Sequence, residues 1–396
     1  MKIGRRKCFD LIFILLMKPV FVLADNIFSP IGSTTVENFD RLIKGISGIR
    51  LHNNAALSSE PFYASLFDES QLDGYSDNRG VYTKFEQLLI SSIGDALANT
   101  SVDVKDKKTI LIVSSTKGNI SLMEMQPLDE ALQKRISLPV SAKLVADYFQ
   151  FKNQPLIVSH ACISGLVAMI TGMRLLQSGV YENAVVAGAD IITRFVLSGF
   201  QSFQAVSSEP CKPFDVNRNG ITLGEGAATV VLSVHKPEMG NAVELSGGSI
   251  SNDANHISGP SRTGEELYQA IDAAVKEAGV NKKDIDMISA HGTATVYNDE
   301  MESKAITLAG LENVPLNSLK GFFGHTLGAA GLIESVVSLH SLKTNTMIGT
   351  PGFTNLGTTK PVNVNSAVRE GNYACCLKTA SGFGGCNAAV VLRKSN

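Results

Sequence analysis

The chain has 396 residues, of which 44% are apolar and 18% are charged, with no Trp and 35 Gly. This composition is typical of a soluble globular protein of two or three domains, and it excludes a fibrous or largely disordered chain. The formal net charge of −2 provides no field to attract nucleic acid or an anionic membrane, so neither is expected as a partner.

The six cysteines show no CxxC pair and no histidine at zinc-finger spacing; they are Cys8, Cys162, Cys211, Cys375, Cys376 and Cys386. A disulfide framework and a metal site are therefore not indicated. This pattern suits a reducing compartment, and we expect a cytoplasmic protein.

At the N-terminus, residues 2–7 are basic and residues 9–17 are apolar, which imitates a secretory signal. The apolar run is too short to span a membrane. Asp10 interrupts it, and cleavage near Ala24 would delete residues 20–24, which we predict as the first strand. Residues 1–18 are thus interpreted as an extension or surface tail, with an export signal as the alternative.

Strands and helices alternate through the first half of the chain. We predict a helix over residues 36–44, an irregular polar excursion over residues 51–80, and a helix over residues 85–97. Residues 109–114 then form a short continuous apolar run of the kind that buried parallel strands show.

Cys162 lies in the next unit, in which residues 156–159 form a strand, residues 160–165 a turn and residues 166–177 a helix. Residues 184–189 supply another buried strand. A thiol at the start of a helix faces unpaired N–H groups, which lower its pKa and favour a nucleophilic thiolate. The alternative interpretation is a small buried core cysteine.

The second half repeats this plan. Residues 286–290 form a strand that ends at His291, and residues 321–328 form a turn before a helix over residues 329–340. Strands over residues 373–379 and 388–393 follow, joined by the glycine-rich turn at 381–385. The shared plan hints at an internal duplication.

His291 and His325 lie beside glycines in HGTAT (291–295) and GHTLGAAG (324–331). One such histidine alone would more often be a satisfied loop residue. One cysteine and two histidines on matched turns instead form a nucleophile with two hydrogen-bond donors.

From about residue 19 the chain resembles the thiolase-like superfamily, and within it the β-ketoacyl-[acyl-carrier-protein] synthases with a Cys–His–His triad. The motifs that carry this resemblance, in chain order, are Ala161-Cys162 with Ser164-Gly165, Lys212 to Asp215 with Arg218, Gly224 to Ala227, HGTAT, Lys320 with GHTLGAAG, and Gly382 to Gly385 before Asn387. Several motifs in the right order are far more specific than any one of them.

The resemblance implies an α/β protein with a five-layered αβαβα fold made of two similar halves, each with a mixed, mostly parallel sheet. We expect residues 19–236 to form the half with the nucleophile and residues 237–396 the half with the histidines. It also implies a homodimer that takes acyl carrier protein as its partner.

The resemblance assigns roles by position. Cys162 takes the acyl chain, His291 and His325 flank it, and Lys320 orients His325. Asp299 and Glu302 hold the loop and tie Lys320 electrostatically, although a solvated helix face would also explain these two acids. Thr293 and Thr295 hydrogen-bond the phosphopantetheine arm, with ordinary turn chemistry as the alternative. Phe383 and Cys162 form the oxyanion hole. Phe200 and Phe203 line the acyl pocket, with core packing as the alternative.

The expected activity is a decarboxylative Claisen condensation of an acyl thioester with malonyl-acyl-carrier protein, in fatty-acid or related polyene or polyketide lipid synthesis. The enzyme needs no cofactor of its own, because phosphopantetheine arrives on the carrier protein. Residues 1–18, His160, Ile163 and the stretch at 51–80 depart from the family pattern and leave the substrate range open.

Two rival functions are a thiolase and a non-catalytic subunit like a chain-length factor. In thiolases the second cysteine precedes the terminal glycines, whereas Cys386 follows them. Chain-length-factor-like subunits typically lack the nucleophile, which is present here as Cys162.

Overall fold

The computed structural model describes residues 18–72, 81–237, 242–253 and 259–395. Residues 1–17 of the predicted N-terminal extension, with the two interpretations given to them, lie outside the described residues. No helix within these ranges is long and apolar enough to cross a membrane.

Two sets of five strands form the framework of the protein. The N-terminal set contains β1 (Phe21–Phe28), β4 (Thr109–Ser114), β5 (Leu156–Val158), β6 (Asn183–Asp190) and β8 (Gly226–Ser233). The C-terminal set contains β9 (Val243–Asn252), β10 (Met287–Ser289), β11 (Pro315–Asn317), β15 (Cys375–Gly382) and β16 (Cys386–Lys394), with β13 (Asn363–Val364) beyond β11. The two sets are joined where the start of β1 pairs with β9.

Both sets have the same topology. Their spatial orders are β1-β8-β6-β4-β5 and β9-β16-β15-β10-β11. In each set the first two pairings are antiparallel and the next two are parallel. The duplication hinted at by the sequence is thus present in the strand order. The expectation of mostly parallel sheets is wrong for the N-terminal set, because β8 lies antiparallel between β1 and β6; in the C-terminal set β13 adds a third parallel pairing.

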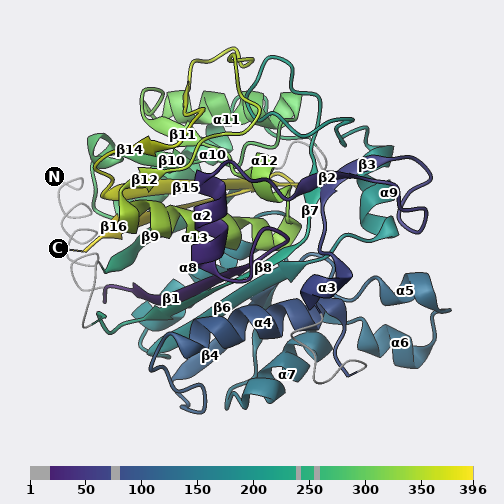
Figure 1. Ribbon diagram of the computed structural model, residues 1–396. Helices are drawn as coiled ribbons and strands as arrows, with labels where there is room; N and C mark the ends of the chain where they lie inside the picture. The colour runs from purple at the N-terminus through teal and green to yellow at the C-terminus, as the bar shows by residue number, and fades with distance from the viewer. Residues whose placement is uncertain (1–17, 73–80, 238–241, 254–258, 396) are drawn as a thin grey trace.

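Two helices lie between the two sheets, α8 (Ser164–Gln177) and α13 (Ala330–Thr344) (Figure 1). The outer face of the N-terminal sheet is covered by α4 (Lys84–Ala98) and α7 (Leu138–Phe149). The outer face of the C-terminal sheet is covered by α10 (Glu265–Glu277) and α11 (Val296–Leu308). This is the expected five-layered αβαβα arrangement. The two central helices are buried on nearly all sides, as their small and apolar sequences require.

Two glycines let the central helices approach closely. A Cβ added at Gly165 of α8 would lie 2.8 Å from the backbone nitrogen of Leu332, and one added at Gly331 of α13 would lie 3.0 Å from that of Leu166. Any larger residue would push the helices apart. Their N-terminal ends, which follow Cys162 and His325, are therefore held next to each other.

The predicted elements are confirmed at most positions, including α2 (Thr35–Ile43) for the helix at 36–44. The predicted irregular stretch at 51–80 is partly wrong. It contains β3 (Phe62–Ser65) and the end of β2 (Ile49–His52), which pair with each other, and β3 also pairs with the distant β7 (Leu223–Gly224). It also contains α3 (Glu69–Leu72), and residues 73–80 lie outside the described part.

The predicted turn at 321–328 also contains two short helices, α12 (Lys320–Phe323) and η3 (Leu327–Ala329). Short elements complete the described chain: α5 (Leu122–Met125), α6 (Glu130–Arg135), α9 (Arg194–Ser202), η2 (Lys282–Asp284), β12 (Thr346–Met347) and β14 (Arg369–Glu370).

Candidate active site

Cys162 lies in a tight turn between β5 and α8. Ala161, just before it, has a φ of 45°, in the left-handed region that non-glycine residues rarely adopt. The Ser164 hydroxyl holds this turn, since it donates to the Ala161 carbonyl at 2.6 Å and accepts from the His160 N–H at 2.7 Å. The strained turn fixes where the thiol of Cys162 is placed.

The resting thiol of Cys162 is protonated at neutral pH. Burial raises its pKa to about 12, and the neighbouring Cys386 adds to the increase, while Lys320 and Lys117 act in the opposite direction. The expectation of a lowered pKa is therefore wrong for the resting site. Desolvation of the thiolate outweighs the positive charges of Lys320 and Lys117 that favour it.

His325 is held in the turn between α12 and η3. Its backbone N–H donates to the Thr222 carbonyl at 2.7 Å, and its Nδ1 accepts from the Leu327 N–H at 3.1 Å. Because Nδ1 is an acceptor, the proton of the neutral ring is on Nε2. Burial, with the charges of Lys320 and Lys378, lowers the pKa of His325 well below its usual value, so the ring is neutral.

His291 follows β10 of the C-terminal set and lies beside His325. The Lys320 Nζ lies 3.3 Å from its Nδ1, and an ammonium group is a donor only, so this ring also has its proton on Nε2. Burial lowers the pKa of His291 well below its usual value, and the charges of Lys320, His325 and Lys378 add to the decrease. The two rings are nearly perpendicular, with centroids 5.2 Å apart.

Glu302 and Asp299 hold the loop that carries His291. The carboxylate of Glu302 accepts from the N–H groups of His291 and Gly292, both at 2.8 Å. Asp299 accepts from the Thr293 N–H at 2.9 Å and from the Phe214 N–H at 2.7 Å. Both acids are fully buried, so the alternative of a solvated helix face is wrong and their predicted contact with the loop is confirmed.

Lys320 does not have the partners that the sequence suggested. Its Nζ donates to the His291 carbonyl at 2.6 Å and lies against the His291 ring, whereas Nδ1 of His325 is bound by a backbone N–H. Its ion-pair partner is Glu334 of α13, at 2.6 Å. The expectations that Lys320 orients His325 and is tied by Asp299 and Glu302 are therefore replaced by contacts with His291 and Glu334.

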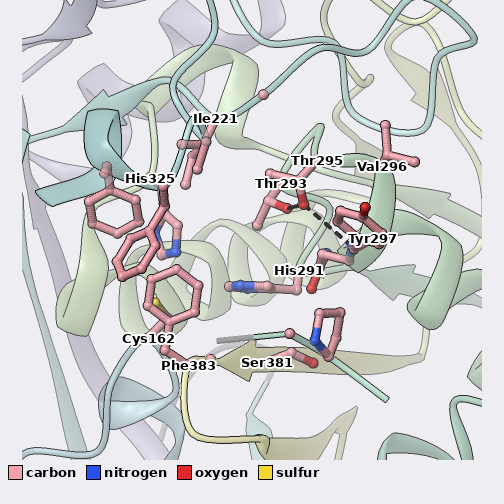
Figure 2. Close-up of a pocket in the computed structure, with 18 of the residues that line it drawn as sticks. Cys162, Ile221, His291, Thr293, Thr295, Val296, Tyr297, His325, Ser381 and Phe383 are labelled. Carbon is pink, nitrogen blue, oxygen red and sulfur yellow. Dashed lines mark hydrogen bonds between the residues drawn. The ribbon is translucent and has the colours of Figure 1, made fainter. Parts of the chain in front are cut away.

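Cys162, His291, His325 and Phe383 line one cavity of about 880 Å³. Figure 2 shows these four side chains along it. Its other predicted lining residues are Phe200, Phe203, Thr293 and Thr295. The Thr293 and Thr295 hydroxyls lie 2.8 Å apart. This volume accommodates an extended acyl or pantetheine-sized ligand.

Three aromatic rings gather next to the thiol. The rings of Phe200 and Phe203 each lie with centroids 5.7 Å from that of Phe383, which is 41% exposed. A Cβ added at Gly382 would lie 3.0 Å from the backbone nitrogen of Cys162, so a glycine lets the Phe383 loop approach the nucleophile.

The amino-acid sequence matches two family models that together span most of the chain. These are the β-ketoacyl synthase N-terminal domain over residues 17–237 and the β-ketoacyl synthase C-terminal domain over residues 242–354. The chain belongs to the β-ketoacyl synthase family. It is thus an acyltransferase-class enzyme of the thiolase-like superfamily.

Curated β-ketoacyl synthases align over most of the chain. A 3-oxoacyl-[acyl-carrier-protein] synthase 2 of Vibrio cholerae is 29% identical, over 95% of this chain and 99% of its own length. One of Rhizobium meliloti is 34% identical over 60% of each chain. A solved ketosynthase in complex with its chain length factor, from Xenorhabdus doucetiae, has a TM-score of 0.85 at 23% identity and covers 96% of this chain and 98% of that chain. That likeness shows the fold.

Within this β-ketoacyl synthase site, sequence reasoning missed Glu334 and Lys378. Both are buried charges within elements that are otherwise small or apolar, α13 and β15. Lysine and glutamate are almost never fully buried unless paired. A charged residue inside a predicted buried helix or strand was the available signal.

Proposed function

We propose that this β-ketoacyl synthase condenses a Cys162-bound acyl group with malonyl-acyl-carrier protein. The observation that supports this most directly is the placement of one thiol and two Nε2–H donors, from His291 and His325, along one cavity. A nucleophile beside two neutral donors suits acyl transfer followed by enolate formation.

In the first half-reaction the sulfur of Cys162 attacks the carbonyl carbon of the acyl thioester. A carbon–sulfur bond to Cys162 forms, and the bond to the carrier's thiol breaks. Because the resting thiol is neutral, its proton is lost during the attack and leaves with the carrier thiol. The backbone N–H groups of Cys162 and Phe383 stabilise the oxyanion in this proposal.

In the second half-reaction the malonyl thioester oxygen accepts hydrogen bonds from Nε2 of His291 and of His325. The bond to the carboxylate breaks, carbon dioxide leaves, and the electron pair remains as an enolate. The enolate carbon attacks the acyl-enzyme, and the Cys162 thiolate that is released takes a proton from solvent. The product is a β-ketoacyl thioester.

The carrier's phosphopantetheine arm enters past the hydroxyls of Thr293 and Thr295, which line the cavity. The apolar rings of Phe200 and Phe203 contact the acyl chain. Lys320 acts by holding the Nδ1 side of His291. The reaction needs no resident cofactor, because loss of carbon dioxide drives carbon–carbon bond formation.

We also propose a homodimer in the cytoplasm. Strand β5 is at the end of the strand order, so one of its edges is available for pairing with a second copy, and Leu156 on it is 39% exposed. The free, buried state of Cys162, Cys211, Cys375, Cys376 and Cys386 supports a reducing compartment. The solved neighbour bound to a chain length factor makes a heterodimer the alternative assembly.

The test offers the protein a panel of acyl-carrier-protein thioesters and then malonyl-carrier protein. Intact mass should show one acyl group on the Cys162 peptide, and the product should be a β-ketoacyl thioester. Failure to acylate with every acyl carrier would contradict the proposal and favour the non-catalytic subunit. Light scattering on the purified chain distinguishes a homodimer from a monomer that waits for another subunit.

A further inference from the structure

Lys378 is a fully buried lysine in the middle of the C-terminal sheet. It lies in β15, between β10 and β16, and β15 is buried over nearly its whole length. An ammonium group in such a place costs several kcal/mol unless its surroundings compensate for lost water. The oxygen atoms that contact the Lys378 ammonium therefore show what compensates for its lost hydration.

Four oxygens surround the Lys378 Nζ. It donates to the carbonyls of Ser289 at 3.2 Å, Ala290 at 3.3 Å and Thr379 at 2.7 Å. It also lies 2.6 Å from a carboxylate oxygen of Glu334. Ser289 and Ala290 are the two residues immediately before His291, so the ammonium group anchors the backbone that carries the histidine.

The same carboxylate joins Lys378 to the His291 ring. Glu334 contacts Lys378 through one oxygen and Lys320 through the other, both at 2.6 Å. Lys320 in turn lies against Nδ1 and the carbonyl of His291. Lys378 thus holds the two residues before His291, and Lys320 holds the His291 carbonyl and ring, with Glu334 contacting both lysines.

Two buried lysines and two buried glutamates lie around His291. Lys320 of α12 and Lys378 of β15 oppose Glu334 of α13 and Glu302 of α11, and Thr379 next to Lys378 donates to Glu302 at 2.7 Å. His325, the buried Asp299 and the thiols of Cys162, Cys211 and Cys376 are further titratable groups near this cluster. Removal of Lys378 leaves one lysine against the two glutamates.

We propose that Lys378 is a positioning residue for the decarboxylation step, a built-in cation that fixes the end of β10 so that His291 presents its Nε2–H to the malonyl thioester. The inference rests on the proposed function and adds a residue to it. Lys378 does not touch the substrate cavity. It acts through His291, by its grip on the strand end and by the charge that it contributes.

Protonation of His291 supports this role. Lys378 is one of the charges that lower the pKa of His291 and of His325, after burial and Lys320. Loss of this positive charge raises the pKa of His291, since an extra net negative charge nearby favours the imidazolium. The ring then takes up a proton at higher pH, and its contact with the Lys320 ammonium becomes repulsive.

A purely structural role is the alternative. Replacement of a buried ion pair by apolar groups is often neutral or stabilising, so stability alone is a weak reason for a lysine here. The two roles also differ in what they alter. A structural role changes the free energy of unfolding, whereas a positioning role changes one half-reaction and the titration of one histidine.

The experiment compares the parental enzyme with Lys378→Met, Lys378→Gln and the control Lys343→Met. Methionine keeps the length of the side chain without its charge, and glutamine keeps a donor for the strand-end carbonyls. Lys343 also pairs with a buried carboxylate, Asp25 at 3.1 Å, but at the far end of α13. Acylation is followed by intact mass, decarboxylation by labelled carbon dioxide, and the His291 ring by its ¹⁵N chemical shift against pH.

For Lys378→Met we expect acylation near the parental rate and a loss of decarboxylation rate of about tenfold or more. This loss should stay below the ~10²–10³-fold that is typical when a hydrogen-bond donor to the oxyanion is removed outright. The His291 titration should move to higher pH, because a nearby positive charge is lost. Lys378→Gln should show the same titration shift with a smaller loss of rate, and it decides the matter if the methionine variant does not fold. Lys343→Met should match the parent in all three readouts.

Parental decarboxylation together with an unchanged His291 titration in a folded Lys378 variant would overturn the inference and leave Lys378 a structural role. An equal loss in acylation and decarboxylation would also count against it. If the parental enzyme itself does not decarboxylate malonyl-carrier protein, the proposed function fails, which is a distinguishable result.

Discussion

Separate replacement of Cys162 and His291 by alanine should disable opposite half-reactions. Cys162→Ala removes the nucleophile, so no acyl-enzyme forms. Both donors survive, because the rings of His291 and His325 are oriented by Lys320 and by the Leu327 N–H, neither of which depends on the thiol. Carbon dioxide release from malonyl-carrier protein should continue without acylation.

His291→Ala should do the reverse. It removes one of two Nε2–H donors to the enolate oxygen, and such a loss typically lowers the rate by about 10²–10³, or about 2.7–4 kcal/mol of transition-state stabilisation. The loop should stay in place, because Glu302 binds backbone N–H groups and not the ring. Acylation of Cys162 should therefore remain within a few-fold of the parental rate.

Acylation is measured by intact mass and decarboxylation by labelled carbon dioxide, on the same preparations. The control is His340→Ala. His340 lies on α13, contacts the Asp25 carboxylate at 3.0 Å and does not line the cavity. It should match the parent in both assays. Acylation of the Cys162→Ala protein, or parental decarboxylation by His291→Ala, would refute the assignment of a nucleophile and two enolate donors.

Three further predictions concern the buried charges. Because the pKa of Cys162 is raised to about 12, its alkylation by iodoacetamide should rise about tenfold per pH unit from pH 7 to 10; a plateau near pH 8, read from the labelled peptide by mass, would contradict this. Glu334→Gln leaves two fully buried lysines without their shared carboxylate and should lower the free energy of unfolding by about 3–5 kcal/mol in urea. Burial alone would raise the pKa of Asp25, but a hydrogen bond from His340 and the charge of Lys343 lower it to about 2. The ionised carboxylate thus stabilises the fold above its unfolded pKa, and this stabilisation is lost as the pH falls through about 2. Asp25→Asn should therefore lower the free energy of unfolding by about 2 kcal/mol at pH 7 and by much less near pH 2. An equal loss at both pH values would refute this reasoning.

The units that hold the chemistry were predictable because their signals are local. The turn at Cys162 lies between an apolar strand and a small-residue helix within about twenty residues, and His291 likewise follows a short strand. Period and glycine placement suffice for such units. The motifs in their order along the chain carried the family resemblance, which the two family models now confirm.

The parts that were missed depend on contacts between distant residues. Lys320 is paired with Glu334 and not with the acids at the predicted positions, because α13 lies beside β10 in the fold, a contact that no local sequence pattern indicates. The protonated state of Cys162 similarly depends on burial by elements from both halves. β3 was missed because one of its partners, β7, lies more than 150 residues away.

The duplication explains why one pocket contains groups from both halves. Cys162 follows β5, and Lys320 and His325 follow β11, the strand at the equivalent place in the second set. Each of these turns leads into a central helix, α8 or α13, and the helices cross closely at Gly165 and Gly331. The crossing brings the nucleophile of one half against the donors of the other. The two halves thus divide the chemistry between equivalent turns, so neither half alone contains both a nucleophile and the groups that stabilise the enolate.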